Sequence, residues 1–123
     1  MAAATSTGGL LGKMQGRVGD TPLIGSGCWA DKRVAISCTG QGEYFIKAAV
    51  ASDIAARLRY AGLSLEDAAQ AAIVDMGNLG GYGGVIAVSR DGKITAPYNS
   101  EGLRRAFAHG NGPVMAGAGA IVD

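Results

Sequence analysis

Residues 16–43 constrain the fold most, because a buried strand there runs through a glycine turn into a helix. Three consecutive apolar residues, Val34, Ala35 and Ile36, lead into the sequence SCTGQG, and a helical pattern begins at Glu43. The start of a helix leaves backbone N–H groups unpaired, and such groups bind anions or stabilise a developing oxyanion. The sequence therefore predicts a polar site where this strand ends.

A second polar feature lies near the start of the same stretch. Arg17 and Asp20 stand three residues apart in a glycine-rich loop. A guanidinium can bind a carboxylate through two parallel hydrogen bonds, and a carboxylate can accept from an ammonium group. The two side chains could instead pair with each other at the surface, a contact worth about 0–1 kcal/mol. Because Thr7 and Thr39 also lie beside glycine-rich bends, we favour one shared pocket for a small zwitterion such as an amino acid.

The bulk composition describes a globular chain. Its 123 residues suit one domain spanning residues 1–123, and 48% hydrophobic with 17% charged residues excludes a disordered chain. The net charge of +1 gives no reason to expect nucleic acid or an anionic membrane as a partner. The apolar runs are shorter than the roughly 20 residues of a membrane helix, and no export signal opens the chain. We therefore expect a cytoplasmic protein.

The chain is poor in metal ligands. It has two cysteines, Cys28 and Cys38, without a C-x-x-C pattern, and one histidine, His109. We expect no metal site and no cofactor, and we expect both cysteines to be buried, reduced thiols. A Cys–His nucleophile pair stays open as an alternative, although nothing in the sequence brings His109 near either thiol.

Hydrophobic periodicity and turn signals predict the order of elements. We expect the end of a strand at residues 1–5 and further strands at 23–30, 33–39, 85–89 and 93–97. One helix is expected over residues 43–60 and a second from Ser64, its capping residue, to about Met76. We expect a flexible connector at 77–84, an irregular segment at 98–108 ending in a short helix, and no clear element after His109. This order predicts an α+β fold with helices packed on a mainly antiparallel sheet.

The sequence also predicts which face of each helix is apolar. In the first helix one stripe recurs every four residues, at Ile46, Val50, Ile54 and Leu58. In the second helix the predicted buried side is Leu65, Ala68, Ala69, Ala72, Ile73 and Met76. We interpret both stripes as core packing.

Several motifs resemble one family in an ordered succession. They are AATSTGG at residues 3–9, GRVGDTPLIG at 16–25, SCTGQGE at 37–43, GLS at 62–64 and YNSEG at 98–102. Together they resemble the β-subunit of plant-type L-asparaginases, also called isoaspartyl peptidases, from residue 2 to about residue 108. Glycosylasparaginases share the GRVGD element, but the other motifs are closer to the asparaginase branch.

The resemblance implies an N-terminal-nucleophile hydrolase, with an αββα sandwich built from two chains that autoproteolysis cuts from one precursor. The implied reactions are hydrolysis of L-asparagine to aspartate and ammonia, and cleavage of β-aspartyl dipeptides. The implied partners are the small-molecule substrate and an α-subunit, in an (αβ)2 assembly. A structural sodium ion is implied as well, bound by the α-subunit.

The resemblance also implies roles for residues of the two polar features. Arg17 would hold the substrate α-carboxylate, and Asp20 would hold its α-ammonium group. The hydroxyl of Thr39 and the N–H of Gly40 would form the oxyanion hole. Gly42 would add a backbone contact near the substrate amino group.

The nucleophile itself has no match in this chain. In the family it is the first threonine of the mature β-subunit, which precedes the AATSTGG motif by the length of a strand. Thr7 would hydrogen-bond to this threonine and orient it, whereas Thr5 and Thr7 are internal and carry no free amine. We therefore expect a β-subunit-like fragment that is inactive alone, or an enzyme whose first strand is encoded upstream of Met1. A non-catalytic amino-acid-binding module, an inactive gene fragment and a glycosylasparaginase-like amidohydrolase remain as alternatives.

Overall fold

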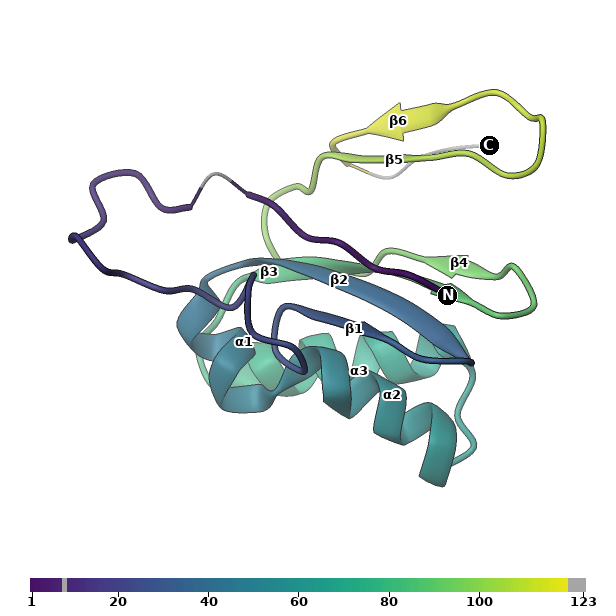
Figure 1. Ribbon diagram of the computed structural model, residues 1–123, viewed down its shortest axis with the longest axis horizontal. Helices are drawn as coiled ribbons and strands as arrows, with labels where there is room; N and C mark the ends of the chain where they lie inside the picture. Colours follow the sequence, from purple (N-terminus) through teal and green to yellow (C-terminus); the bar gives the residue numbers. More distant parts are fainter. Residues whose placement is uncertain (8, 120–123) are drawn as a thin grey trace.

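The computed structural model describes residues 1–7 and 9–119, so Gly8 of the AATSTGG motif and residues 120–123 lie outside the described residues. The elements of the described part are β1 (Cys28–Ala30), β2 (Val34–Gly40), α1 (Gly42–Ala48), α2 (Val50–Tyr60), α3 (Leu65–Asn78), β3 (Gly83–Ser89), β4 (Ile94–Thr95), β5 (Arg105–Phe107) and β6 (Met115–Gly117). The helices cover one face of an antiparallel sheet (Figure 1). The predicted α+β fold is confirmed.

The main sheet has the strand order β1-β2-β3-β4, and all its pairings are antiparallel. Along β2, Val34, Ile36 and Cys38 are buried in the core under the helices. Because side chains alternate along a strand, Ser37 and Thr39 lie on the opposite face of the sheet. Ser37 and Thr39 are both half-buried on that face, and they are the polar residues of the strand.

The N-terminal segment and a small second sheet lie on the side of the main sheet away from the helices (Figure 1). The second sheet pairs β5 with β6. The strand predicted to end at residues 1–5 is not present, which corrects the prediction. Hydroxyl groups, and not a ladder of backbone hydrogen bonds, attach these residues to the sheet. Ser37 Oγ donates to the Ala4 carbonyl at 3.1 Å, and Thr5 Oγ1 donates to the Gly27 carbonyl at 3.2 Å.

Helix α3 follows the sequence prediction closely. Its predicted apolar side is buried at all six positions. Ser64 caps the helix, because its Oγ accepts a hydrogen bond from the backbone N–H of Asp67 at 3.1 Å. The predicted hairpin is also present as β3 and β4, closed by a turn in which Gly92 has a φ of 83°. Within residues 1–7 and 9–119, no helix is long and apolar enough to cross a bilayer.

The single helix predicted over residues 43–60 is two helices in the structure. Ala49 adopts a left-handed conformation, with φ 47° and ψ 45°, and ends α1 before α2 begins. This break changes the register of the apolar stripe between the two helices. Phe45 is therefore fully buried in α1, whereas Ile46, the predicted core residue, is 37% exposed.

Three further predictions are corrected. The strand expected at 23–30 is reduced to β1, because turns formed by Leu23 N–H with the Asp20 carbonyl and Ser26 N–H with the Leu23 carbonyl precede it. The connector at 77–84 is partly ordered, since α3 runs to Asn78 and β3 starts at Gly83. The short helix expected before residue 108 is strand β5, which pairs with β6 in the region where no element was predicted.

Candidate active site

Five of the six sequence-predicted site residues line one cavity of about 320 Å³. They come from three parts of the chain: the N-terminal segment, the loop before β1, and the end of β2. The five residues are Thr7, Arg17, Asp20, Thr39 and Gly40. The sixth, Gly42, lies directly against Asp20. The structure thus brings the two polar features of the sequence together at the end of the central strand.

Asp20 is the most enclosed polar group of this cavity. The residue is 4% exposed, and its Oδ2 atom has no hydrogen-bond partner within the described residues. Two glycines allow the chain to close around it. A Cβ atom on Gly42 would lie 3.0 Å from Asp20 Oδ1, and one on Gly27 would lie 2.2 Å from the Asp20 carbonyl oxygen. Both positions therefore require glycine for the backbone to approach Asp20 so closely.

The environment of Asp20 disfavours its charge. Burial raises the pKa of Asp20, because the carboxylate loses water and its Oδ2 atom gains no hydrogen-bond partner among the described residues. Backbone N–H groups of residues 20 and 21 and the positive charge of Arg17 oppose this shift, whereas the negative charge of Glu43 adds to it. A cationic group bound in the cavity would supply the missing partner for Oδ2 and favour the ionised carboxylate.

Arg17 provides the positive charge of the cavity. Its Nη2 atom lies 3.8 Å from Oε1 of Glu43, whose side chain is 63% exposed. The ion pair formed by Arg17 is therefore with Glu43, and not with Asp20 as the surface-pair alternative required. Because Glu43 is exposed and its contact is long, this pair is weak, and an incoming carboxylate can compete for the guanidinium.

The Thr39–Gly40 corner lies where β2 meets β3. Gly40 has a φ of 149°, and a Cβ atom there would lie 2.4 Å from the Tyr82 carbonyl oxygen and 2.6 Å from Gly83 Cα. Helix α1, which follows, has only seven residues, and the Gln41 side chain does not cap it. The long helix expected after this corner is therefore corrected to a short one, whereas the anion site expected at its start stays a prediction.

Five further residues line the cavity that sequence reasoning did not assign to it. They are Gly9, Leu10, Thr21, Gln41 and Glu43. Their proximity in sequence to Asp20 and Gly40 was the available signal for three of them. Leu10 carried no such signal, because the approach of its loop to β2 is a long-range contact.

The cysteines take no visible part in the site. Both are free thiols, Cys38 buried in the core and Cys28 partly exposed. Burial raises the pKa of the Cys38 thiol, and the nearby charge of Asp20 adds to the shift, so this thiol is inert at neutral pH. His109 lies beside Gly92, at the far end of β3 from the cavity. Among the residues that the structure describes, no group of three His, Cys, Asp or Glu side chains could hold a metal ion.

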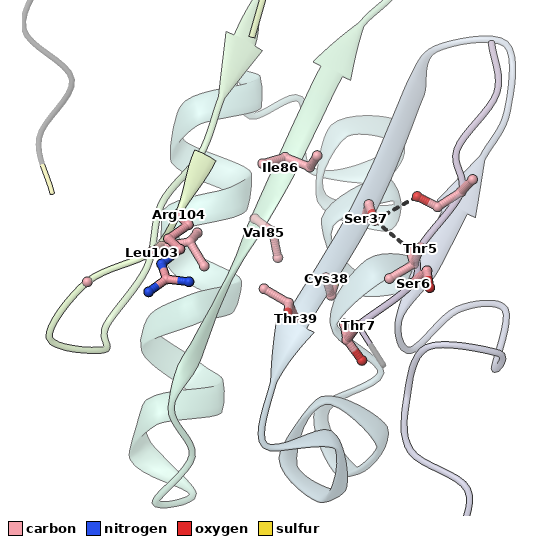
Figure 2. Close-up of a pocket in the computed structure, with 12 residues that line it drawn as sticks. Thr5, Ser6, Thr7, Ser37, Cys38, Thr39, Val85, Ile86, Leu103 and Arg104 are labelled. Atoms are coloured by element: carbon pink, nitrogen blue, oxygen red, sulfur yellow. Dashed lines mark hydrogen bonds between the residues drawn. The ribbon is translucent and has the colours of Figure 1, made fainter. Parts of the chain in front are cut away.

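A larger hollow of about 660 Å³ lies over the open face of β2 and β3. Figure 2 shows it between the N-terminal segment, which carries Thr5 and Thr7, and the segment that carries Leu103 and Arg104. The hydroxyl of Ser37 bonds to the N-terminal segment at one side of this hollow. Thr7 and Thr39 line both this hollow and the smaller cavity, so they mark the junction between the two.

The fold and the site define an α+β protein with a polar cavity of about 320 Å³ that is lined by an arginine and a buried aspartate. A family model described as "Asparaginase" matches residues 1–116, and the chain belongs to this family. It is 52% identical over 111 residues to the isoaspartyl peptidase of Salmonella typhimurium, a match that covers 89% of this chain and 36% of that protein.

Two further relatives match a similar share of this chain. The identity is 50% to the isoaspartyl peptidase of Escherichia coli, covering 89% of this chain and 35% of that protein. It is 45% to the probable isoaspartyl peptidase/L-asparaginase 2 of Arabidopsis thaliana, covering 90% and 34% respectively. The chain thus spans about a third of the length of the curated relatives it matches.

Proposed function

We propose that this chain is the substrate-binding part of an amidohydrolase that hydrolyses L-asparagine to aspartate and ammonia, cleaves β-aspartyl dipeptides, or does both. The single observation that carries this proposal is the Oδ2 atom of buried Asp20, which has no partner among the described residues, in a cavity that Arg17 also lines. A carboxylate without a partner and a guanidinium in one cavity suit the ammonium and carboxylate groups of one amino acid. The family and the names of the relatives support the same substrate class.

The charges of the cavity suggest how the substrate binds. Arg17 binds the α-carboxylate through its planar fork of donors and exchanges its weak contact with Glu43 for a stronger one. Asp20 accepts from the α-ammonium group, which removes the cost of its burial. The side-chain carbonyl of the substrate then faces the Thr39–Gly40 corner. There the hydroxyl and the backbone N–H stabilise the oxyanion as charge develops.

The proposed reaction is acyl transfer to a threonine hydroxyl. A free α-amine on that threonine takes up the hydroxyl proton, and the oxygen attacks the carbonyl carbon of the substrate. Collapse of the tetrahedral intermediate releases ammonia or an amino acid and leaves a threonyl ester, which water then hydrolyses to aspartate. Thr7, at the junction of the two cavities, orients the nucleophile.

We extend the proposal to the whole protein. A complete αββα sandwich would stack a second sheet on the open face of the main sheet, with an α-subunit supplying part of it in an (αβ)2 assembly. The position of β5 and β6 on this side supports such a layer order (Figure 1).

Calorimetry with L-aspartate tests the binding role on the 123-residue chain. We expect Arg17→Gln to abolish detectable binding, whereas Arg104→Gln, which removes the same charge from the larger hollow, leaves binding unchanged. Equal effects of the two substitutions, or no binding by the unaltered chain at millimolar aspartate, would contradict the proposal. Ammonia release from L-asparagine by the full-length protein tests the chemistry. Binding without turnover there would favour a non-catalytic amino-acid-binding module.

A further inference from the structure

Asn99 joins two segments that meet behind the proposed oxyanion corner. Its side-chain Oδ1 accepts from the Gly83 N–H at 2.9 Å, and its Nδ2 donates to the Gly81 carbonyl at 2.9 Å. Its own backbone N–H donates to the Gly83 carbonyl at 3.0 Å. Asn99, although its residue is exposed, therefore makes three hydrogen bonds to one short glycine segment.

That segment depends on external bonds for its order. Glycine leaves the backbone more freedom than any other residue, and the sequence here is GGYGG. The close packing does not admit larger residues, because a Cβ atom on Gly81 would lie 2.4 Å from Met76 Sδ and 2.5 Å from Tyr44 Cβ. Hydrogen bonds from Asn99 therefore add to this close packing in fixing the segment.

The glycine segment in turn contacts the corner. Gly83 pairs directly with Gly40 in the β2–β3 register. A Cβ atom on Gly83 would lie 2.8 Å from Gly40 Cα and 2.4 Å from the Thr39 carbonyl oxygen. Since the two backbones are in direct contact, a displacement of Gly83 must displace Gly40 as well.

Gln41 holds the same segment from the other side. Its N–H donates to the Tyr82 carbonyl at 2.9 Å, and its Oε1 accepts from the Tyr82 N–H at 3.0 Å. The backbone of residues 81–83 is thus bonded at every residue, by Asn99 at Gly81 and Gly83 and by Gln41 at Tyr82. These hydrogen bonds restrain the segment that lies against the corner.

We propose that Asn99 is a positioning residue that fixes the Gly40 backbone, through Gly81 and Gly83, for recognition of the group at the distal end of the amino-acid substrate. The inference rests on the proposed function, because it assigns Gly40 to that end of the cavity. Asn99 does not line the cavity, so its effect on a ligand passes through the glycine segment. An amide is required because it offers one acceptor and one donor to the same peptide segment.

Two ligands separate positioning from general stability. L-Aspartate carries a side-chain carboxylate that reaches the corner, whereas L-alanine presents only the head group to Arg17 and Asp20. We expect Asn99→Ala to weaken L-aspartate binding roughly tenfold, a change that corresponds to the net contribution of about one hydrogen bond. L-Alanine binding should be unchanged. Ser100→Ala is the matched control, because the Ser100 hydroxyl bonds only to the Gly102 carbonyl within the described residues. Equal weakening of both ligands by Asn99→Ala would overturn the inference.

A ligand-free measurement keeps this test independent of the proposed function. We expect the backbone amide resonances of Gly40 and Gly83 to shift in Asn99→Ala and to stay in place in Ser100→Ala. Unmoved Gly40 resonances would overturn the positioning role even if the cavity binds amino acids. Failure of the unaltered chain to bind either ligand would instead refute the proposed function. Asn99→Asp, which keeps the acceptor and loses the donor to Gly81, serves in both measurements if the alanine variant does not fold.

Discussion

Replacement of Asp20 by asparagine is expected to stabilise the free protein and to destroy its binding site. The substitution keeps the shape of the side chain and removes a charge that is 4% exposed and has an unpartnered Oδ2 among the described residues. An unsatisfied buried polar group costs about 1–3 kcal/mol, and part of this penalty persists for a neutral amide. We therefore expect a gain of about 1 kcal/mol at pH 7, or roughly 4 °C in melting temperature.

The pH dependence of this gain has a definite sign. Burial raises the pKa of Asp20 above its ordinary value of 3.8, so the folded state holds the proton more tightly than the unfolded state does. The stability of the unaltered protein therefore falls as pH rises through the folded pKa. Below the ordinary value, where Asp20 is protonated in both states, the difference between the variant and the unaltered protein should be smallest.

Binding should change in the opposite direction. Loss of one member of a buried charge pair costs about 2–5 kcal/mol, which corresponds to a drop in L-aspartate affinity of about 30-fold or more. Thermal melts at about pH 3 and pH 7 measure the change in stability, and calorimetry at pH 7 measures the change in binding. A variant that melts lower than the unaltered protein at pH 7, or that binds L-aspartate equally well, would refute the reasoning.

Substitutions at three further positions test local geometry, each through the melting temperature of the variant. Gly40→Ala should lower the free energy of unfolding by about 1–3 kcal/mol, because the added Cβ would lie 2.6 Å from Gly83 Cα. An unchanged melting temperature would show that the backbone at the corner can move to admit the Cβ. Ala49→Gly should raise the free energy of unfolding by about 1 kcal/mol, since Ala49 has a φ of 47° that glycine adopts without strain. A lower melting temperature would show that the packing of the Ala49 methyl group contributes more than the strain costs. Ser64→Ala should lose about 1 kcal/mol with the bond to Asp67 N–H, whereas Ser64→Asp should retain most of it.

Local signals in the sequence predicted much of the fold. The cap at Ser64, the buried face of α3 and the Asp91–Gly92 turn of the hairpin all appear in the structure. Each depends on residues within one or two turns of the chain, so the sequence pattern contains the whole cause. The Arg17–Asp20 loop and the Thr39–Gly40 corner were likewise recognisable as polar, glycine-rich positions, and the structure lines one cavity with them. Their individual roles stay predictions.

Other features have causes that are distant in sequence. The left-handed turn at Ala49 lets Phe45, rather than Ile46, enter the core, and periodicity alone favoured a continuous helix. Residues 1–5 read as a strand, yet hydroxyl groups of Thr5 and Ser37 attach them to the sheet without a ladder.

The sequence by itself determined helix α3 with its cap, the turn of the hairpin and which residues carry charge, because short-range sterics and hydrogen bonds decide the helix cap and the turn. The tertiary structure alone decided that Asp20 is buried with one oxygen that no described residue partners, and that Glu43 faces Arg17. The physical reason is that desolvation and ion pairing depend on which distant segments close around a group. For Asp20 these are the backbones at Gly27 and Gly42, whose approach no local pattern records.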